Sequence, residues 1–301
     1  MGLTIKELIP IGERLLSEGG VEDYKIDAEA LLSHAIGYDK NKIFMNWAAE
    51  IDFKHTEVYF DLLNLRAKGT PLQYITGEQY FMGRRFSVNE SVLIPRPETE
   101  GLVESITEYM KQVGNVKTLL DIGTGSGAIA ISLAKVFPSV KVTAVDISEE
   151  ALKVARQNAK ALGAEKNITF IKSDLFSAIK TGALGKKFDI IVSNPPYISS
   201  GEIAGLQREV KEHEPLLALD AGEDGLIFFR RIAEEAKPYF KKKAALFFEI
   251  GAEQGEAVSS ILEEAGSYSG IEVRKDLAGL DRIVNADYIL GLGKTEKRFR
   301  D

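Results

Sequence analysis

The segment Leu119-Leu120-Asp121-Ile122-Gly123-Thr124-Gly125-Ser126-Gly127 carries the strongest structural signal in the chain. An apolar run ends near an acid, three glycines follow at alternate positions, and an apolar pattern with helical spacing comes next. Glycine has no Cβ and adopts positive φ, so a loop of this kind lets a ligand approach the backbone closely. The segment therefore predicts a buried strand, a ligand-binding loop and the first turn of a helix.

Outward from this segment, apolar runs alternate with amphipathic patterns. We expect strands at residues 118–121, 142–146, 169–172, 188–193, 244–250, 271–274 and 282–289, and helices at 98–113, 128–136, 149–162, 226–236 and 253–265. Apolar strands between helices are typical of a parallel sheet covered on both faces. The last two strands are joined too briefly for a helical crossover and should form an antiparallel edge hairpin. The prediction is an α/β fold with a Rossmann-like seven-stranded sheet.

Residues 1–71 have a different pattern, which predicts a small helical bundle. Three apolar stripes with helical spacing are Leu8, Ile11, Leu15 and Leu16; Ala28, Leu31, Leu32 and Ala35, ended by Gly37; and Val58, Leu62, Leu63 and Leu65. Residues 72–95 are rich in aromatic and β-branched side chains, interrupted by Gly77 and Gly83, and predict a β-hairpin linker with strand residues between Tyr74 and Leu93. Residues 96–292 then form the large domain, and residues 293–301 a polar tail.

Composition limits the class of protein. No apolar run among the 301 residues approaches the roughly 20 residues of a membrane span. The absence of cysteine excludes disulfides and thiolate chemistry and fits a cytoplasmic protein, and the three histidines lack metal-ligand spacing. The net charge is −7, and residues 1–78 carry 8 Lys/Arg against 13 Asp/Glu. We therefore expect no metal, no membrane association and no direct nucleic-acid binding, and we interpret the acidic helical domain as a protein-docking module.

The glycine loop and its acid favour one cofactor over another. The spacing G-x-G-x-G differs from the G-x-G-x-x-G of dinucleotide-binding enzymes. A carboxylate such as Asp121 at the loop would repel a pyrophosphate, but it suits a ligand with an ammonium group and a cationic sulfur. The sequence therefore predicts S-adenosylmethionine as cofactor, with S-adenosylhomocysteine as product.

Two further acids end strands in register with the loop. Asp146 lies about 20 residues past the last glycine, the position of a ribose-hydroxyl acceptor, and Asp174 is expected to accept from the adenine amino group. Each acid alone could equally cap a helix, but three at strand ends favour binding. The expected cofactor-binding residues are Asp121, Gly123, Thr124, Gly125, Ser126, Gly127, Asp146, Ile147, Asp174, Leu175 and Asn194.

The run Ser193-Asn194-Pro195-Pro196-Tyr197 closes the fourth strand and supplies the candidate catalytic residues. An amide or exocyclic amine nitrogen is a poor nucleophile, because its lone pair is delocalised. The Asn194 side-chain oxygen and the Pro195 carbonyl could accept its two N–H groups, and these contacts strengthen as the nitrogen becomes tetrahedral and cationic. Pro195 and Pro196 make the acceptors rigid, and Tyr197 offers a flat face for the target group. The interpretation is methyl transfer to a planar nitrogen, accelerated mainly by alignment.

These motifs resemble the release factor glutamine methyltransferases, which methylate the glutamine of the Gly-Gly-Gln motif in peptide chain release factors. The resemblance runs through nearly the whole chain and includes Gly69-Thr70-Pro71-Leu72-Gln73-Tyr74-Ile75-Thr76-Gly77, Leu93-Ile94-Pro95-Arg96-Pro97-Glu98-Thr99-Glu100, Glu214-Pro215, Ala218-Leu219, Asp224-Gly225-Leu226, Glu249-Ile250-Gly251, Lys275-Asp276-Leu277-Ala278-Gly279 and Asp281-Arg282. It implies that Gly123 to Gly127 and Asp146 bind the cofactor and that Asn194 to Tyr197 hold the glutamine. Some members carry an aromatic residue where Leu175 stands. Residues 1–71 become a helical substrate-recognition domain and residues 96–292 a methyltransferase domain.

Three alternatives stay open at this point. A nucleic-acid amine methyltransferase shares the Asn-Pro-Pro-Tyr box, but it needs a basic surface or a recognition domain, and the acidic module disfavours it. A ribosomal-protein glutamine methyltransferase would have identical chemistry and differ in the helical domain and hairpin. A cofactor-binding regulator without activity would not need the intact Asn194 box.

Overall fold

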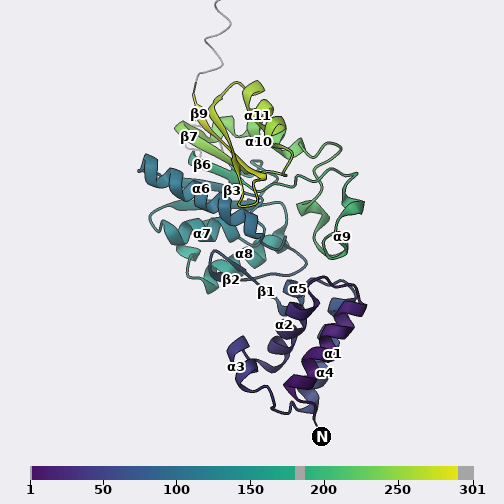
Figure 1. Ribbon diagram of the computed structural model, residues 1–301. Helices are drawn as coiled ribbons and strands as arrows, with labels where there is room; N and C mark the ends of the chain where they lie inside the picture. Colours follow the sequence, from purple (N-terminus) through teal and green to yellow (C-terminus); the bar gives the residue numbers. More distant parts are fainter. Residues whose placement is uncertain (1, 180–186, 291–301) are drawn as a thin grey trace, which may run out of the picture. The chain divides into compact units, whose positions relative to one another are not determined.

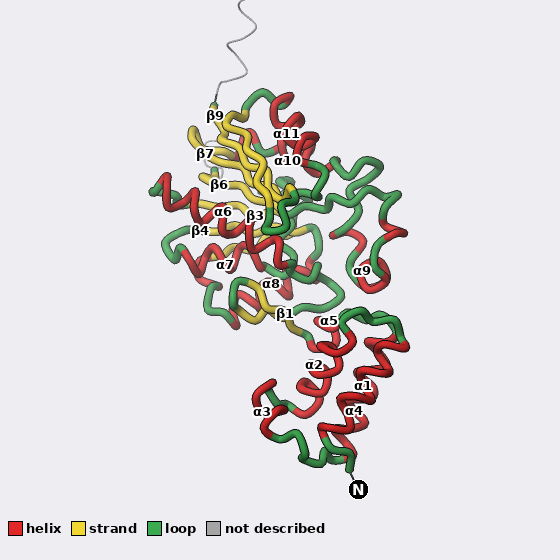
Figure 2. The backbone as a smooth tube through the Cα atoms, in the orientation of Figure 1, coloured by secondary structure: helices red, strands yellow, loops and turns green. Residues whose placement is uncertain are grey.

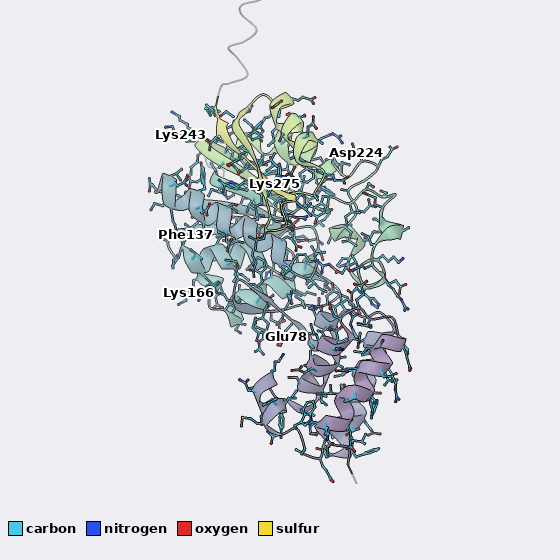
Figure 3. The ribbon with its side chains drawn as sticks, in the orientation of Figure 1. Glu78, Phe137, Lys166, Asp224, Lys243 and Lys275 are labelled. Atoms are coloured by element: carbon cyan, nitrogen blue, oxygen red, sulfur yellow. The ribbon has the colours of Figure 1, made fainter. Side chains whose placement is uncertain are left out.

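The computed structural model describes residues 2–179 and 187–290, which form two compact units (Figure 1). The first unit contains Met1–Glu78 together with Leu206–His213, and the second contains Gln79–Gly205 and Glu214–Asp301. The expected polar tail, 293–301, lies outside the described residues. Glu78, labelled in Figure 3, marks the boundary at which the chain leaves the first unit.

The first unit is a bundle of short helices. Its helices are α1 (Ile5–Glu18), α2 (Tyr24–Ile36), α3 (Lys40–Met45), α4 (Phe53–Ala67), α5 (Leu72–Thr76) and α9 (Arg208–His213). A capping box between Thr4 and Glu7 starts α1, and Gly37 ends α2 with a φ of 68°. The core contains Ile5, Leu8, Leu16, Ala28, Leu31, Leu32, Tyr59 and Leu63.

Two details of this unit differ from the sequence prediction. In α4 the buried face contains Tyr59 and Leu63, whereas Val58 and Leu65 of the expected stripe are 37% and 46% exposed. The expected strand around Tyr74 is wrong, because Leu72–Thr76 forms the helix α5. Pro71 precedes this helix with a φ of −56°, and proline favours a helix start because its φ is fixed in the helical range.

A β-hairpin opens the second unit. Its strands are β1 (Glu78–Phe81) and β2 (Arg84–Ser87), joined by Met82 and Gly83, which both have positive φ as a tight hairpin turn requires. Phe81 and Phe86 insert into the core of the second unit. Residues 88–96 continue without a strand, so the expected strand positions Val88, Val92 and Leu93 are wrong.

A seven-stranded sheet forms the centre of the second unit, in the order β5-β4-β3-β6-β7-β9-β8. The strands are β3 (Thr118–Ile122), β4 (Lys141–Asp146), β5 (Ile168–Lys172), β6 (Phe188–Ser193), β7 (Phe240–Glu249), β8 (Tyr268–Lys275) and β9 (Asp281–Ile289). Strands β3 to β7 are parallel, and β9 runs antiparallel to both β7 and β8. The predicted seven-stranded sheet with an antiparallel edge hairpin is confirmed.

Helices cover both faces of this sheet (Figure 2). They are α6 (Pro97–Val113), α7 (Ala128–Val136), α8 (Glu149–Ala161), α10 (Ile227–Glu235) and α11 (Gly255–Glu264), with short 3₁₀ turns at Glu165–Asn167, Ile203–Gly205, Leu216–Ala218 and Lys237–Tyr239. One core cluster includes side chains of α6, α7 and α8, and the other includes side chains of α10 and α11. Within the described ranges, we find no helix with the length and apolar character needed to cross a membrane.

The strand order places the site. From β3 the chain moves outward to β4 and β5, then returns to add β6 on the other side of β3. Ligands of open α/β sheets bind beyond the carboxyl ends of the strands where the order switches in this way. The loop after β3 and the segment after β6 therefore lie on either side of the switch point.

Candidate active site

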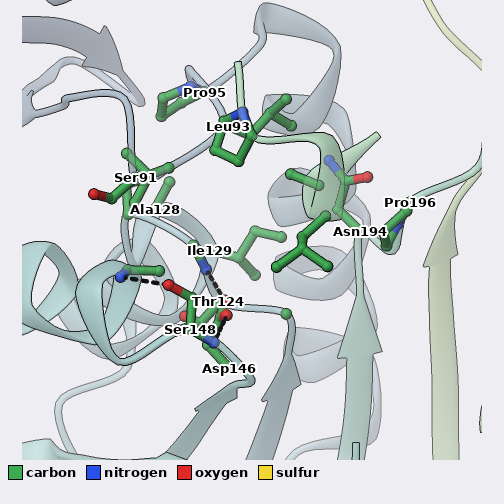
Figure 4. A pocket seen from close by; sticks show the side chains of 18 of the residues that line it. Ser91, Leu93, Pro95, Thr124, Ala128, Ile129, Asp146, Ser148, Asn194 and Pro196 are labelled. Atoms are coloured by element: carbon green, nitrogen blue, oxygen red, sulfur yellow. Dashed lines mark hydrogen bonds between the residues drawn. The ribbon is translucent and has the colours of Figure 1, made fainter. Parts of the chain in front are cut away.

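A cavity of about 310 Å³ opens at the carboxyl ends of β3, β4 and β6 (Figure 4). Its lining includes seven residues that the sequence predicted for the site: Gly123, Thr124, Gly125, Ser126, Asp146, Asn194 and Pro196. In Figure 4, Asn194 and Pro196 lie across the pocket from Asp146 and Ser148. The loop after β3 and the box after β6 thus face one common space.

Asp146 organises the cofactor side of the cavity. Its Oδ2 accepts from the backbone N–H of Gly125 at 2.9 Å, and its Oδ1 accepts from that of Ser148 at 2.9 Å. Burial raises the pKa of Asp146, and the backbone hydrogen bonds oppose that shift. Each carboxylate oxygen can accept a second hydrogen bond, so the held carboxyl group can receive the hydroxyl groups of a ribose.

The loop itself depends on glycine at two points that the structure makes explicit. Gly125 has a φ of 54°, which presents its N–H to Asp146. Gly127 has a φ of 83°, and a Cβ there would lie 2.8 Å from Ile131 Cδ1 and 3.2 Å from Ala155 Cβ. Side chains at these positions would strain the turn and separate α7 from α8.

Asp121 lies beneath the loop and not in the cavity wall. It is fully buried, and its Oδ2 accepts from the Thr124 hydroxyl at 2.6 Å. Its Oδ1 makes no hydrogen bond of normal geometry in the part of the chain that the structure describes. Burial raises the pKa of Asp121 to about 7, and the Thr124 hydroxyl and the Ala130 backbone N–H oppose that rise. A buried carboxyl oxygen without a normal hydrogen bond suits a cationic group, because an opposite charge offsets the cost of burying the carboxylate.

The Asn194 box is divided between the cavity and the core. Asn194 and Pro196 line the cavity, and the Asn194 Nδ2 donates to the Thr99 hydroxyl at 3.3 Å. Pro195 and Tyr197 do not line it. The Tyr197 ring packs against the core, its carbonyl accepts from Gln254 Nε2 at 2.9 Å, and burial raises its pKa to about 12.

Four other predicted cofactor residues lie outside the cavity lining, among them Gly127 at the start of α7. The Asp174 carboxylate forms an ion pair with Arg231 at 3.1 Å. Leu175 is buried in the core with a φ of 45°, and Ile147 is 50% exposed. The start of α8 contributes Ser148, Glu150 and Ala151 to the wall instead.

Sequence reasoning assigned no role to one wall of the cavity. That wall comes from the segment before α6 and from the segment after Glu214, with Ser91, Val92, Leu93, Pro95, Arg96, Thr99, Pro215, Leu217 and Ala218. Arg96 forms an ion pair with the buried carboxylate of Glu214, which also accepts from the backbone N–H of Ile94 at 3.4 Å. Two sequence features could have indicated this wall, the Pro95-Arg96-Pro97 run and Glu214-Pro215. Proline fixes φ, so a charged residue next to proline is held on a rigid segment.

Two family models match the chain. A "Methyltransferase domain" model matches residues 115–266, and a "PrmC N-terminal domain" model matches residues 7–77. The chain is 42% identical over 284 residues to the release factor glutamine methyltransferase of Clostridium acetobutylicum, which covers 94% of this chain and 98% of that protein. It is 43% identical over 288 residues to the protein of that name from Bacillus subtilis, with 94% and 97% covered.

Two solved structures are similar to parts of the chain. The catalytic domain of hMettl16, in complex with an RNA hairpin, is 15% identical, has a TM-score of 0.53, and covers 75% of this chain and 81% of that chain. That likeness concerns the fold alone. A protein-(glutamine-N5) methyltransferase from Alicyclobacillus acidocaldarius is 29% identical, with a TM-score of 0.41, and covers 68% of this chain and 99% of its own.

Proposed function

Because the chain belongs to the release factor glutamine methyltransferase family, we propose that it methylates the side-chain amide nitrogen of the Gly-Gly-Gln glutamine in a peptide chain release factor. Family membership confirms the resemblance drawn from the sequence motifs. It also confirms the prediction of an S-adenosylmethionine-dependent methyltransferase. The observation that carries the proposed chemistry is the position of Asn194, across one cavity from the glycine loop and Asp146.

The residues of the cavity fit S-adenosylmethionine. The backbone-held carboxyl of Asp146 in the wall suits ribose hydroxyls, and the buried carboxyl of Asp121 beneath the loop favours a positive charge in the cavity above it. Leu93, Ala128 and Ile129 add apolar surface to the lining. When bound, the cofactor supplies a methyl group on a cationic sulfur, which leaves as a neutral thioether.

The chain's own residues prepare the acceptor nitrogen. The Asn194 side-chain oxygen and the Pro195 carbonyl accept the two N–H groups of the glutamine amide and fix its plane. These acceptors stabilise the positive charge that develops as the carbon–nitrogen bond forms. The nitrogen then loses one proton to solvent, which restores a neutral amide. Pro195 and Pro196 limit backbone motion, so the acceptors need little reorganisation.

We propose that the helical unit contacts the protein substrate. Glutamine is too common for the Asn194 pocket alone to select one site, so contacts remote from the chemistry must supply the discrimination. Phe44, Met45 and Phe53 of this unit are 81%, 79% and 75% exposed. Exposed apolar side chains on an acidic unit suit a folded protein with apolar and basic groups, and they disfavour nucleic acid. A release factor works on ribosomes, so this interaction would take place in the cytoplasm.

A substrate comparison tests the proposal. Purified enzyme is incubated with labelled S-adenosylmethionine and, separately, with release factor, ribosomes or DNA, and the methylated product is identified by mass mapping. We expect label in release factor at the Gly-Gly-Gln glutamine. Label in a ribosomal protein or in DNA, with none in release factor, would refute the proposed substrate.

Point variants of the helical unit test its role without removing it. Combined Phe44→Ser and Phe53→Ser should lower kcat/KM for intact release factor and leave that for a short Gly-Gly-Gln peptide unchanged. Val113→Ser, which changes an exposed apolar residue of the other unit, serves as the matched control. Equal effects on factor and peptide would assign these side chains to stability and not to docking.

A further inference from the structure

Glu249 is a buried acid that the reaction described above does not use. It ends β7, where Phe248 lies in register with Ser193 of β6, so Glu249 is placed beside Asn194. The residue is 1% exposed, and its Oε2 has no hydrogen-bond partner among the described residues. Burying a carboxyl group in this way is costly, which makes a purely structural role a poor explanation.

The surroundings of Glu249 lead to the acceptor of the target amide. The Thr99 hydroxyl and the Asn194 side chain lie near the Glu249 carboxyl, and both oppose the rise of its pKa. Thr99 Oγ1 accepts from Asn194 Nδ2 at 3.3 Å. With its lone pair toward Asn194, the Thr99 hydroxyl has its proton available for Glu249.

This arrangement distinguishes the two possible orientations of the Asn194 amide. The Nδ2 group has two N–H donors and no acceptor, whereas Oδ1 is an acceptor only. With Nδ2 toward Thr99 and Glu249, both donors meet acceptors. A half-turn of the amide would place Oδ1 against those oxygens, and the acceptors would repel each other. The orientation that remains directs Oδ1 to the target nitrogen.

We propose that Glu249, acting through Asn194 and Thr99, is a positioning residue that keeps Asn194 Oδ1 available to accept from the target amide. The proposal rests on the proposed role of Asn194 in methyl transfer. Glu249 acts as a hydrogen-bond acceptor here, and its charge is not required. Burial raises the pKa of Glu249 to about 7, in keeping with an acid that lies among few compensating donors.

Substitutions at Glu249 test whether the residue acts as a hydrogen-bond acceptor or through its negative charge. Glu249→Met removes the acceptor with little change in length and should lower kcat by about 10- to 100-fold, the effect of small misplacement in an active site. Affinity for S-adenosylhomocysteine should stay unchanged, because Glu249 does not line the cofactor cavity. Glu249→Gln keeps one acceptor oxygen and should retain most of kcat. A Gln variant as inactive as the Met variant would overturn the proposal in favour of a charge effect.

Substitutions at two further positions distinguish the positioning role from damage to the fold. Phe248 is the preceding residue of β7, so its side chain points to the opposite face of the sheet, where it packs against Phe229. Phe248→Leu should lower stability and leave kcat unchanged. At Thr99, the Val substitution should lower kcat, and the Ser substitution, which keeps the hydroxyl, should restore most of the lost kcat. If Phe248→Leu lowers kcat as much as Glu249→Met, the effect belongs to packing and the proposal fails.

A spectrum of the Asn194 side chain gives a readout that does not depend on activity. In ¹⁵N-labelled enzyme, the two Nδ2 protons are assigned by their loss in Asn194→Asp. We expect their resonances to move toward those of a solvent-exposed asparagine in Glu249→Met, and much less in Glu249→Gln. If wild-type enzyme methylates no glutamine, the proposed function fails while this spectrum still tests the contact. Unchanged Asn194 resonances in Glu249→Met would overturn the proposal itself.

Discussion

The two halves of the site hold their polar groups in different ways. At the ends of β3 and β4, Asp146 is held by backbone N–H groups, and Asp121 is held by a hydroxyl only three residues away. At the ends of β6 and β7, Asn194 donates to the Thr99 hydroxyl and lies beside Glu249, and both residues come from distant parts of the chain. The cofactor half is thus built from local contacts and the target half from long-range ones. Substitutions in the two halves should therefore affect different measured quantities.

The largest effect is expected from Asn194→Ala. Turnover at saturating substrate should fall by roughly a hundredfold or more, as for the loss of one preorganised polar contact. Affinity for S-adenosylhomocysteine should stay near that of wild type, because the cofactor contacts lie at the ends of β3 and β4. Steady-state kinetics and calorimetric titration measure the two quantities. A large loss of affinity with normal turnover would erase the distinction between the halves.

The converse variant is Asp146→Ala. Loss of charge-assisted hydrogen bonds to the ribose costs about 1.5–3 kcal/mol, which is roughly a 10- to 150-fold loss of affinity. Turnover at saturating cofactor should change much less. Calorimetry with S-adenosylhomocysteine tests this, with circular dichroism as the check on folding. Unchanged affinity would remove Asp146 from the ribose site.

Local sequence carries more information about the cofactor half than about the target half, for a physical reason. The glycine loop, its acid and the strand ends are encoded by residues close together in the chain, so periodicity and spacing reveal them. The pairing of Arg96 with Glu214 and of Asn194 with Glu249 depends on which strands become neighbours, which local pattern does not specify.

The errors in the predicted secondary structure come from contacts that local sequence does not encode. Leu72–Thr76 is rich in strand-forming residues, but it packs as a helix on α2 and α4 of the first unit. Asp174 pairs with Arg231, which lies 57 positions later, and its contact with adenine stays a prediction. Leu206–His213 joins the first unit although it follows the catalytic box in sequence. In each case tertiary contacts override local preference.

A smaller effect is expected in the cofactor half, where the pH dependence of stability should reveal the ionisation of Asp121. Burial raises the folded-state pKa of Asp121 from 3.8 to about 7, so the folded protein without ligand loses stability as pH rises through that window. Asp121→Asn cannot ionise and should escape this loss. At pH 8 its Tm should exceed that of wild type by about 1–2 °C, a change that corresponds to roughly 1 kcal/mol in a chain of 301 residues.

The control for this prediction is the same comparison at low pH. Near pH 4 the Asp121 carboxyl is largely protonated in the folded protein, and the two proteins should have similar Tm values. Affinity of the Asn variant for S-adenosylhomocysteine should be weaker, because the acid that faces the cationic group is gone. An Asn variant that is less stable at every pH would contradict the raised pKa.

The smallest effect is expected from Tyr197→Phe. The ring packs against the core, and the contact with Gln254 uses the Tyr197 carbonyl and not the phenol. Turnover should stay close to that of wild type, whereas Tyr197→Ala should lower it by removing the packed ring. A Phe variant as impaired as the Ala variant would assign the hydroxyl a role in the reaction.

Site mapping of the methyl group tests the central claim most directly. Release factor is treated with S-adenosylmethionine and either wild-type enzyme or Asn194→Ala, and the tryptic peptide that contains Gly-Gly-Gln is fragmented by mass spectrometry. We predict one added methyl group on the glutamine side-chain nitrogen with wild-type enzyme, and almost none over the same period with an Asn194→Ala protein that still binds S-adenosylhomocysteine. A methyl group on another residue, or equal methylation by both proteins, would contradict the assignment of Asn194 as the acceptor that holds the target amide.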